Sequence, residues 1–177
     1  ITYYDITVEK MVEDIERKKL YIEKFAFTEP ERYWHYLHHL IPKNPFLVAA
    51  LDIAAWDLYG KLRRQPLYKI WGLDPSKSPL TDFTIGIDTT EKMVAKMKAT
   101  PWPIYKIKVG TPDDVERVAA LRQHTDAVFR VDANAGWTLE EATQKIPLLK
   151  ELGVELVEQP LAKDNWDGMK SLMAVSP

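Results

Sequence analysis

The chain has 177 residues, of which 46% are hydrophobic and 28% are charged. This composition supports a sizeable core and excludes a disordered chain. The 24 basic and 26 acidic residues give a formal net charge of -2, so no strong positive field would attract nucleic acid or an anionic membrane. The absence of cysteine excludes disulfides, thiolate nucleophiles and zinc–thiolate sites.

The sequence shows no targeting or membrane segment. No run approaches the roughly 18 consecutive apolar residues that a membrane-spanning helix requires. Residues 1–10 alternate between polar and apolar types and lack the basic start of a signal peptide. We therefore expect a cytoplasmic protein that binds neither membrane nor nucleic acid, and a homo-oligomer is compatible with the sequence.

Residues 1–78 are predicted to be helical. Apolar residues recur at helical spacing over residues 8–25, 31–40 and 45–62. Each of the three predicted helices follows a capping signal, at Thr7, at Thr28 with Glu31 in a capping box, and at Asn44. A segment rich in proline and glycine comes next and predicts a linker that ends near residue 78.

Residues 79–177 alternate between short β-branched runs and capped helices. Strands are predicted at residues 83–87, 105–109, 128–131 and 155–157. The helices after these strands are expected to open at residues 88–91, 111–114 and 138–141 and at Asn165. Four successive βα units of similar length indicate parallel strands with right-handed crossovers.

The number of βα units leaves two interpretations open. A closed (β/α)₈ barrel needs about 200 to 250 residues, about twice the length of the segment after the linker. The segment therefore forms either an open four-stranded sheet or part of a longer protein. We favour a fragment of a longer protein.

The second predicted strand carries two lysines at its carboxyl end. Lys106 and Lys108 are two residues apart, so both project from the same face of the strand. Inside a barrel, mutual repulsion and partial burial should lower the pKa of at least one of them toward that of a working base. The alternative is a solvated edge strand, in which both lysines are ordinary surface residues.

The next two strands end in carboxylates. Asp132 and Glu158 each come directly after an apolar run, one βα unit apart. Adjacent parallel strands lie about 4.8 Å apart, so the two acids could share a cation, and a carboxylate set favours Mg²⁺. Alternatively, each acid caps the loop after its strand. Trp137 lies after Asp132 in its loop and either borders a substrate or packs beneath the loop.

Together these residues suit the removal of a proton next to a carboxylate. A divalent ion stabilises the negative charge that forms when an α-proton leaves, and a lysine of lowered pKa removes the proton. Lys108 lies nearer the carboxyl end of its strand than Lys106 and is the better base. Lys106 could neutralise the substrate carboxylate.

These motifs resemble the enolase superfamily in its muconate-lactonising subgroup. The resemblance is carried by Lys106 with Lys108, by residues 131–137 (VDANAGW) and by residues 157–160 (VEQP). Residues 49–61 (AALDIAAWDLYGK) are similar to the segment that leads from that family's capping domain into its barrel. Within the subgroup, residues 81–88 (TDFTIGID) are most similar to the dipeptide epimerases.

The resemblance implies roles for individual residues. Asp132 and Glu158 would be Mg²⁺ ligands, and Lys108 would be the acid/base on one face of the substrate's α-carbon. Three further residues would contact the substrate: Lys106, Thr84 and Asn134. The family pattern also implies a third carboxylate ligand, an opposite-face lysine and an acidic pair that lie outside these 177 residues, so the fragment alone is expected to be inactive.

The implied fold is α/β and enolase-like. Residues 1–78 would be part of an α+β capping domain with its linker, and residues 79–177 would be the first four βα units of a modified (β/α) barrel. The implied activity is a Mg²⁺-dependent epimerase, an isomerase that acts on the C-terminal residue of a small-molecule dipeptide. N-acylamino acid racemase, o-succinylbenzoate synthase and muconate cycloisomerase remain alternatives, as does a non-catalytic scaffold or binding protein.

Overall fold

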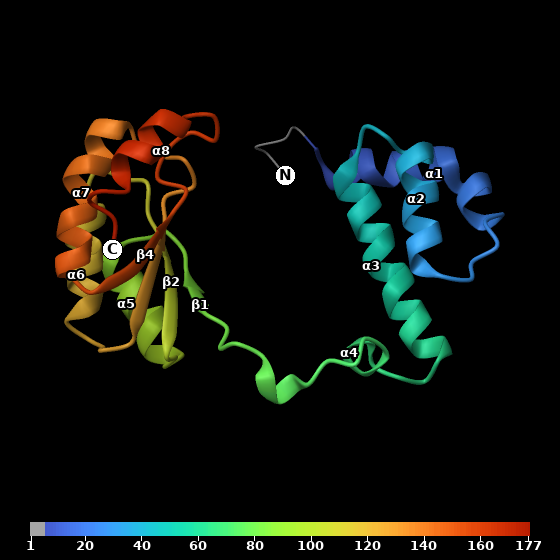
Figure 1. Ribbon diagram of the computed structural model, residues 1–177, viewed down its shortest axis with the longest axis horizontal. Helices are drawn as coiled ribbons and strands as arrows, with labels where there is room; N and C mark the ends of the chain where they lie inside the picture. The colour runs from blue at the N-terminus through green and yellow to red at the C-terminus, as the bar shows by residue number, and fades with distance from the viewer. Residues whose placement is uncertain (1–5) are drawn as a thin grey trace. The chain divides into compact units, whose positions relative to one another are not determined.

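The computed structural model describes residues 6–177, and the chain divides into two compact units between Ser78 and Pro79 (Figure 1). The described part of the first unit is helical. Its elements are α1 (Val8–Glu23), α2 (Pro30–Leu40), α3 (Pro45–Leu62), α4 (Leu67–Ile70) and a short 3₁₀ helix (Pro75–Lys77). The three longer helices are those that the apolar spacing predicts.

Two of the three predicted helix caps are confirmed. The Thr7 side chain accepts a hydrogen bond from the Lys10 amide at 3.2 Å, and the Asn44 side chain accepts one from the Leu47 amide at 3.1 Å. The capping box predicted for α2 is wrong, because Glu29 is the N-cap residue and makes no side-chain cap bond. Pro30, at the first helical position, needs no amide partner, and the helix starts there, inside the predicted box and one residue before Glu31.

The core of the first unit forms mainly between α2 and α3. Leu37, Leu47 and Val48 are almost completely buried there. Helix α1 has no fully buried residue but packs Met11 and Ile15 against this core. Apolar contacts between the helices, aromatic as well as aliphatic, therefore stabilise this unit.

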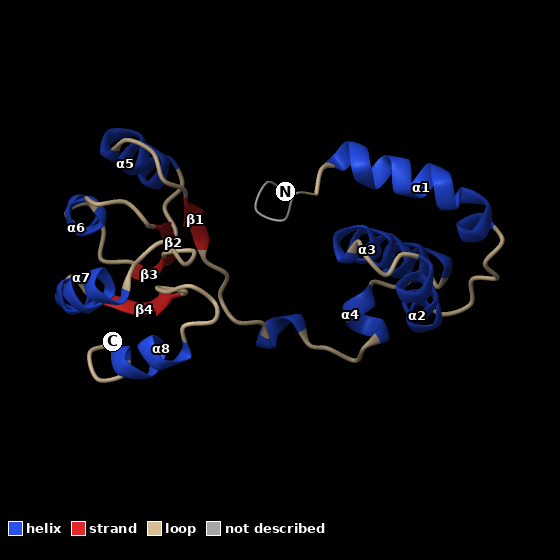
Figure 2. Cartoon of the chain, turned by 90° about the horizontal axis from the view of Figure 1, so that it is seen from above, coloured by secondary structure: helices blue, strands red, loops and turns tan. Residues whose placement is uncertain are grey.

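The second unit is a four-stranded parallel sheet in the order β1-β2-β3-β4. The strands are β1 (Phe83–Ile85), β2 (Ile104–Lys108), β3 (Val128–Asp132) and β4 (Val154–Glu158). The helices α5 (Thr90–Ala99), α6 (Asp114–Arg122), α7 (Leu139–Glu151) and α8 (Trp166–Leu172) lie along one side of the sheet (Figure 2). The predicted succession of βα units is confirmed, with strand ends shifted by one or two residues.

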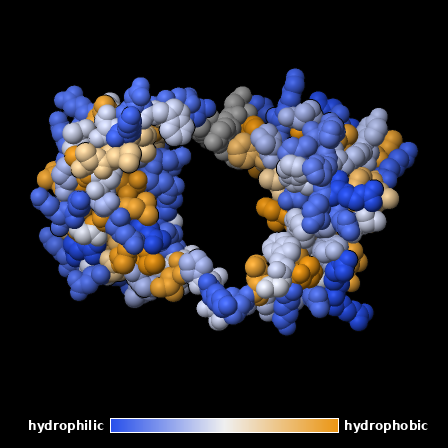
Figure 3. Space-filling view, in the orientation of Figure 1, coloured by the Kyte–Doolittle hydropathy of each residue, from blue (hydrophilic) through white to orange (hydrophobic). Residues whose placement is uncertain are grey.

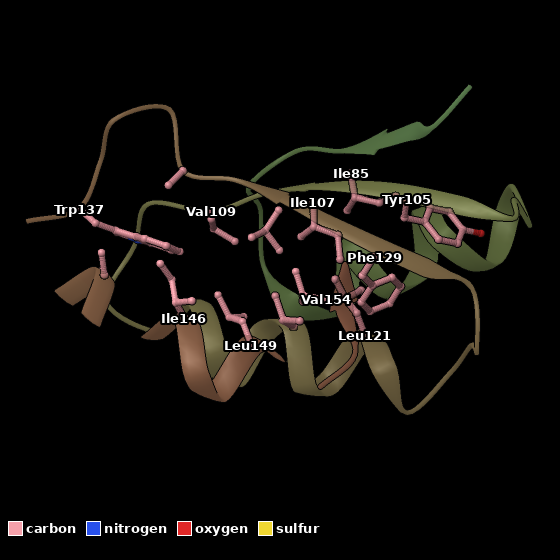
Figure 4. Packing of buried hydrophobic residues seen from close by; sticks show 14 of the residues in the cluster. Ile85, Tyr105, Ile107, Val109, Leu121, Phe129, Trp137, Ile146, Leu149 and Val154 are labelled. Carbon is pink, nitrogen blue, oxygen red and sulfur yellow. The ribbon is translucent and has the colours of Figure 1, made fainter. Parts of the chain in front are cut away.

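The two faces of the sheet have different roles. Ile85 and Ile107 pack on the helix side with side chains such as Leu121 and Ile146 (Figure 4). Both isoleucines and Val131 of the same cluster are completely buried. The intervening residues occupy the other face, which carries the polar side chains Thr84, Lys106 and Arg130 in one cross-strand row. Because side chains alternate along a strand, the apolar core fixes which residues reach the polar face.

Two helices of this unit begin differently from each other. Thr138 and Glu141 form the predicted capping box at the start of α7, with both reciprocal bonds present. Helix α6 begins at Asp114, the last residue of the predicted opening at 111–114, and its N-cap residue Asp113 makes no side-chain cap bond. The Asp114 carboxylate instead accepts hydrogen bonds from Thr111, which holds residues 111–113 as a turn before the helix.

A β-bulge interrupts the pairing of β3 with β4. Phe129 pairs with Val154, but Arg130 pairs with Leu156, so Glu155 is an extra residue on β4. After the extra residue, the side chains of β4 again alternate between the two faces in step with those of β3, and Glu158 lies opposite Asp132. Arg130 Nε donates a 2.9 Å hydrogen bond to the Glu155 carboxylate at this point.

Arg122, the last residue of α6, ties together the chain segments that enter β3 and β4. Its guanidinium donates to the carbonyl oxygens of Ala127 and Leu152 at 2.7 and 2.9 Å. The same group lies 3.7 Å from the centre of the Phe129 ring. Arg122 therefore fixes the amino-terminal ends of these two strands, which is the end away from Lys108 and Asp132.

The visible surface of each unit is mostly hydrophilic, with hydrophobic residues interspersed (Figure 3). Within residues 6–177, the helices are too short or too polar to qualify as membrane spans.

Candidate active site at the strand ends

A cluster of opposite charges lies where β2 and β3 end. Lys108 Nζ is 2.6 Å from Asp132 Oδ2, and Lys106 Nζ is 3.0 Å from the same oxygen. Asp132 is only 1% exposed, whereas both lysine side chains are partly exposed. Strand β2 lies between β1 and β3, so the solvated edge-strand interpretation of the two lysines is wrong.

Glu158 joins this cluster from β4. Lys106 Nζ lies 2.6 Å from Glu158 Oε2, so one ammonium group contacts both carboxylates. Asp132 and Glu158 are direct neighbours in the register of β3 and β4. The two acids therefore both contact one ammonium group, that of Lys106.

The ion pairs determine whether the pKa of each shifted group in the cluster is raised or lowered. Hydrogen bonds with Glu158 and then Asp132 raise the pKa of Lys106, and these contacts outweigh its partial burial. Burial acts to raise the pKa of Asp132, but hydrogen bonds from Lys108 and Lys106 hold it below its usual value. The sequence predicts a lowered pKa for at least one of the two lysines. That lysine is not Lys106, because its contacts with the carboxylates offset the repulsion between the lysines.

The loop after β3 also contributes to the cluster. Asn134 Oδ1 accepts a 2.8 Å hydrogen bond from Lys108 Nζ. The backbone N–H of Asn134 donates a 2.9 Å hydrogen bond to Asp132 Oδ1. Asp132 therefore caps its own loop and binds the lysines as well, so the two interpretations of this acid are compatible. Asn134, Ala135 and Gln159 adopt positive φ angles, a concentration of unusual backbone that is typical of functional sites.

Thr84 lies beside Lys106 on the neighbouring strand. The register of β1 and β2 makes the two residues direct neighbours, and Thr84 is exposed on the polar face. The structure thus brings all six candidate residues to the same face and end of the sheet: Thr84, Lys106, Lys108, Asp132, Asn134 and Glu158.

Asp114 is a buried carboxylate beneath the site that no sequence motif marks as functional. It is 1% exposed and accepts hydrogen bonds from the Gly110 and Thr111 amides, at 3.0 and 2.8 Å. It also accepts from the Trp137 indole at 2.7 Å and from Lys145 Nζ at 2.9 Å. The helical positions of Asp114 and Lys145 give no signal of this contact, because they are 31 residues apart.

Trp137 packs beneath the loops. It is 4% exposed, lies at one end of the core (Figure 4) and is held by Asp114, so packing is the correct one of its two interpretations. Burial acts to raise the pKa of Asp114, but its hydrogen bonds with Thr111, Lys145 and Trp137 hold the pKa below the usual value. Asp114 is therefore a charged acceptor for all these donors.

The loops after β2 and β3 approach each other at two glycines. A Cβ on Gly136 would lie 2.8 Å from the Ala133 carbonyl oxygen and 3.2 Å from Gly110 Cα. Gly110 itself has a φ of +125°, which side chains rarely tolerate. Close backbone contact at this point requires glycine on both sides.

Gly136→Ala should destabilise the protein by about 1–3 kcal/mol, because rigid backbone atoms cannot move away from the added methyl group. Gly86→Ala is the matched control, since a Cβ there meets no atom within 4 Å. Urea unfolding of both variants and the wild type measures the difference. Equal midpoints for the two variants would contradict the close packing of the loops.

The donor set fits part of a magnesium site. Asp132 and Glu158 offer carboxylate oxygens, the ligand type that Mg²⁺ prefers, and Lys106 shows that both reach one cation. Among residues 6–177 no group of three histidine, cysteine or acidic side chains is arranged to hold a metal. The two carboxylates fit as two ligands of a larger set.

Comparison with known proteins identifies the family. The model of the family described as enolase C-terminal domain-like matches residues 88–177. The L-Ala-D/L-amino acid epimerase of Maribacter sp. is 53% identical over 171 residues, which cover 97% of this chain and 50% of the relative. The L-Ala-D/L-Glu epimerase of Bacteroides thetaiotaomicron is 40% identical over 179 residues, which cover 99% of this chain and 46% of the relative.

A solved structure gives the same picture. The dipeptide epimerase of Cytophaga hutchinsonii, solved with Mg and the dipeptide D-Ala-L-Val, is 28% identical with a TM-score of 0.73. The match covers 84% of this chain and 42% of that protein. The chain belongs to the enolase superfamily and is similar to its dipeptide epimerases. It spans about half the length of the curated relatives that it matches.

Proposed function

We propose that the protein containing this chain is a Mg²⁺-dependent dipeptide epimerase. It would invert the α-carbon of the dipeptide's C-terminal residue by a 1,1-proton transfer. The observation that carries this proposal is the convergence of Lys108, Asp132 and Glu158 at the ends of three neighbouring strands. Similarity to epimerases of dipeptides supports the substrate class.

Lys108 is proposed as the base on one face of the substrate. Its neutral amine takes the α-proton, and the electrons of the C–H bond move into the carboxylate to form an enediolate. A proton donor on the opposite face then completes the inversion, and we assign that donor to the second half of the barrel. Asn134 Oδ1 and Asp132 Oδ2, at 2.8 and 2.6 Å, orient the Lys108 amine.

Lys106 and Thr84 are proposed to bind the substrate. Lys106 is central on the polar face, and its ammonium is suited to pair with the substrate carboxylate. Thr84 lies next to it on β1 with an exposed side chain, which suits contact with the dipeptide backbone. Asn134 would contact the substrate from the loop above Lys108.

Asp132 and Glu158 are proposed to hold Mg²⁺. When bound, the ion supplies stabilisation of the negative charge that develops on the substrate carboxylate. Asp132 is held in place by the Asn134 amide and by its burial, so one ligand is fixed before the ion binds. Glu158 is more exposed and completes this part of the site from β4.

The two compact units support a proposed division into domains. We propose that residues 1–78 belong to the capping domain and its linker, and that residues 79–177 form the first half of the barrel. The division between Ser78 and Pro79 supports the boundary. The four parallel βα units support the barrel assignment.

A deuterium-exchange experiment tests the proposed function. The full-length protein is incubated with Mg²⁺ in D₂O with a library of L,L-dipeptides, and mass spectrometry detects deuterium at the α-carbon of the C-terminal residue. Exchange together with epimerisation supports the proposal. Activity only on N-acylamino acids or on cycloisomerase substrates would contradict dipeptides as the substrate class. Binding without any turnover would favour a non-catalytic role.

A further inference from the structure

Asp114 receives an unusual number of hydrogen bonds for a residue that does not face the polar side of the sheet. Its two oxygens accept from the backbone amides of Gly110 and Thr111, in the loop after β2. They also accept from the indole of Trp137, in the loop after β3. One buried charge therefore links the loop after the strand of Lys108 to the loop after the strand of Asp132.

Lys145 completes this link. Its ammonium lies 2.9 Å from Asp114 Oδ2 and donates to the Thr111 carbonyl oxygen at 2.7 Å. It also lies 5.2 Å from the centre of the Trp137 ring. Lys145 thus neutralises the buried carboxylate and bonds to one of the loops directly.

We propose that Asp114 is a positioning residue that holds Lys108 in register with Asp132 for proton transfer. The inference rests on the proposed epimerase function. Gly110 is only two residues beyond Lys108, and its backbone contacts the loop of Asp132 through Ala133 and Gly136. Loss of the link would let the two loops separate and would lengthen the contact between the base and its partners.

Arg122 provides the matched control because it performs a similar task at the other end of the same strands. It bonds the carbonyl oxygens of Ala127 and Leu152 before β3 and β4. A purely structural role of Asp114 predicts that variants of the two residues behave alike. A positioning role predicts that only the Asp114 variant affects the reaction.

The test compares Asp114→Asn with Arg122→Lys in the full-length protein, with Trp137→Phe as a second variant that removes the indole donor and keeps an aromatic ring. Measurements are made with Mg²⁺ at a temperature at which all variants are folded. A misplaced base costs up to about 100-fold in rate, so we expect Asp114→Asn to lower kcat substantially with little change in KM. Trp137→Phe should have a smaller effect in the same direction, and Arg122→Lys should keep kcat.

Hydrogen exchange gives a readout that does not depend on activity. Peptides that contain Gly110, Thr111 and Trp137 should exchange at least about tenfold faster in Asp114→Asn, and not in Arg122→Lys. Unchanged exchange in these peptides, or equal kcat losses in the Asp114 and Arg122 variants, would overturn the inference. If the wild type fails to turn over dipeptides, the proposed function fails, while the exchange result still decides whether Asp114 holds the loops.

Discussion

Lys108→Ala should abolish epimerisation in both directions in the full-length protein. A general base contributes about 10²- to 10⁴-fold to the rate, and no other amine of the cluster lies as close to the end of β2. The opposite-face group should still remove the proton of the other epimer. We therefore expect deuterium exchange to disappear for one epimer and to persist without inversion for the other, measured by mass spectrometry and chiral chromatography.

Two variants separate the loss of the base from the loss of charge. Lys108→Arg keeps the positive charge beside Asp132 but cannot act as a base at neutral pH, so it should be as inactive as the alanine variant. Lys98→Ala removes an exposed lysine of α5 and should retain full activity. Substantial epimerisation by Lys108→Arg would contradict the assignment of Lys108 as a base.

Asp132→Asn should remove magnesium binding and activity together. Asp132 is buried, fixed by the Asn134 amide and placed opposite Glu158, so no neighbouring acid can take its position. Changes in a supporting shell already cost about 10- to 100-fold in metal affinity, and loss of a ligand should cost at least as much. Titration calorimetry measures the Mg²⁺ affinity of both proteins. Chelation of Mg²⁺ should abolish the activity of the wild type, and added Mg²⁺ should restore it.

The matched controls for this prediction change charge without changing the ligands. Asp126→Asn removes an exposed carboxylate just before β3 and should leave Mg²⁺ affinity unchanged. Lys106→Met removes the ammonium that contacts both carboxylates and should raise Mg²⁺ affinity, because the two cations repel each other at short range. Weaker binding in Lys106→Met would show that the two acids do not share the cation.

Local signals predict most of the fold. Thr7, Asn44 and Thr138 cap the helices that they precede, because a cap depends only on residues within one turn. The same signal fails at Thr28, and within the predicted opening at 111–114 the helix begins only at Asp114. At these positions a neighbouring proline or a long-range partner, such as Lys145 for Asp114, determines where the chain turns.

The candidate site is predictable where it depends on the alternation of one strand. Lys106 and Lys108 share a face because they are two residues apart, and the strand order then brings Asp132 to them. The raised pKa of Lys106 could not be predicted, because its pairing with Glu158 depends on the register of a different strand. Asp114 could not be identified because its partners come from α7 and from two loops.

The extra residue on β4 shifts the inward–outward alternation of the strand by one position. Sequence comparison and redesign must take this shift into account. Counted from Val154 in strict alternation, Glu158 would fall on the helix side of the sheet, and an ionised acid would be buried among aliphatic side chains. The single inserted residue, Glu155, therefore determines on which face of the sheet the Glu158 carboxylate lies. A strand transplanted from another barrel can place a carboxylate on this face only if it contains the same inserted residue or has the acid one position earlier or later in its sequence.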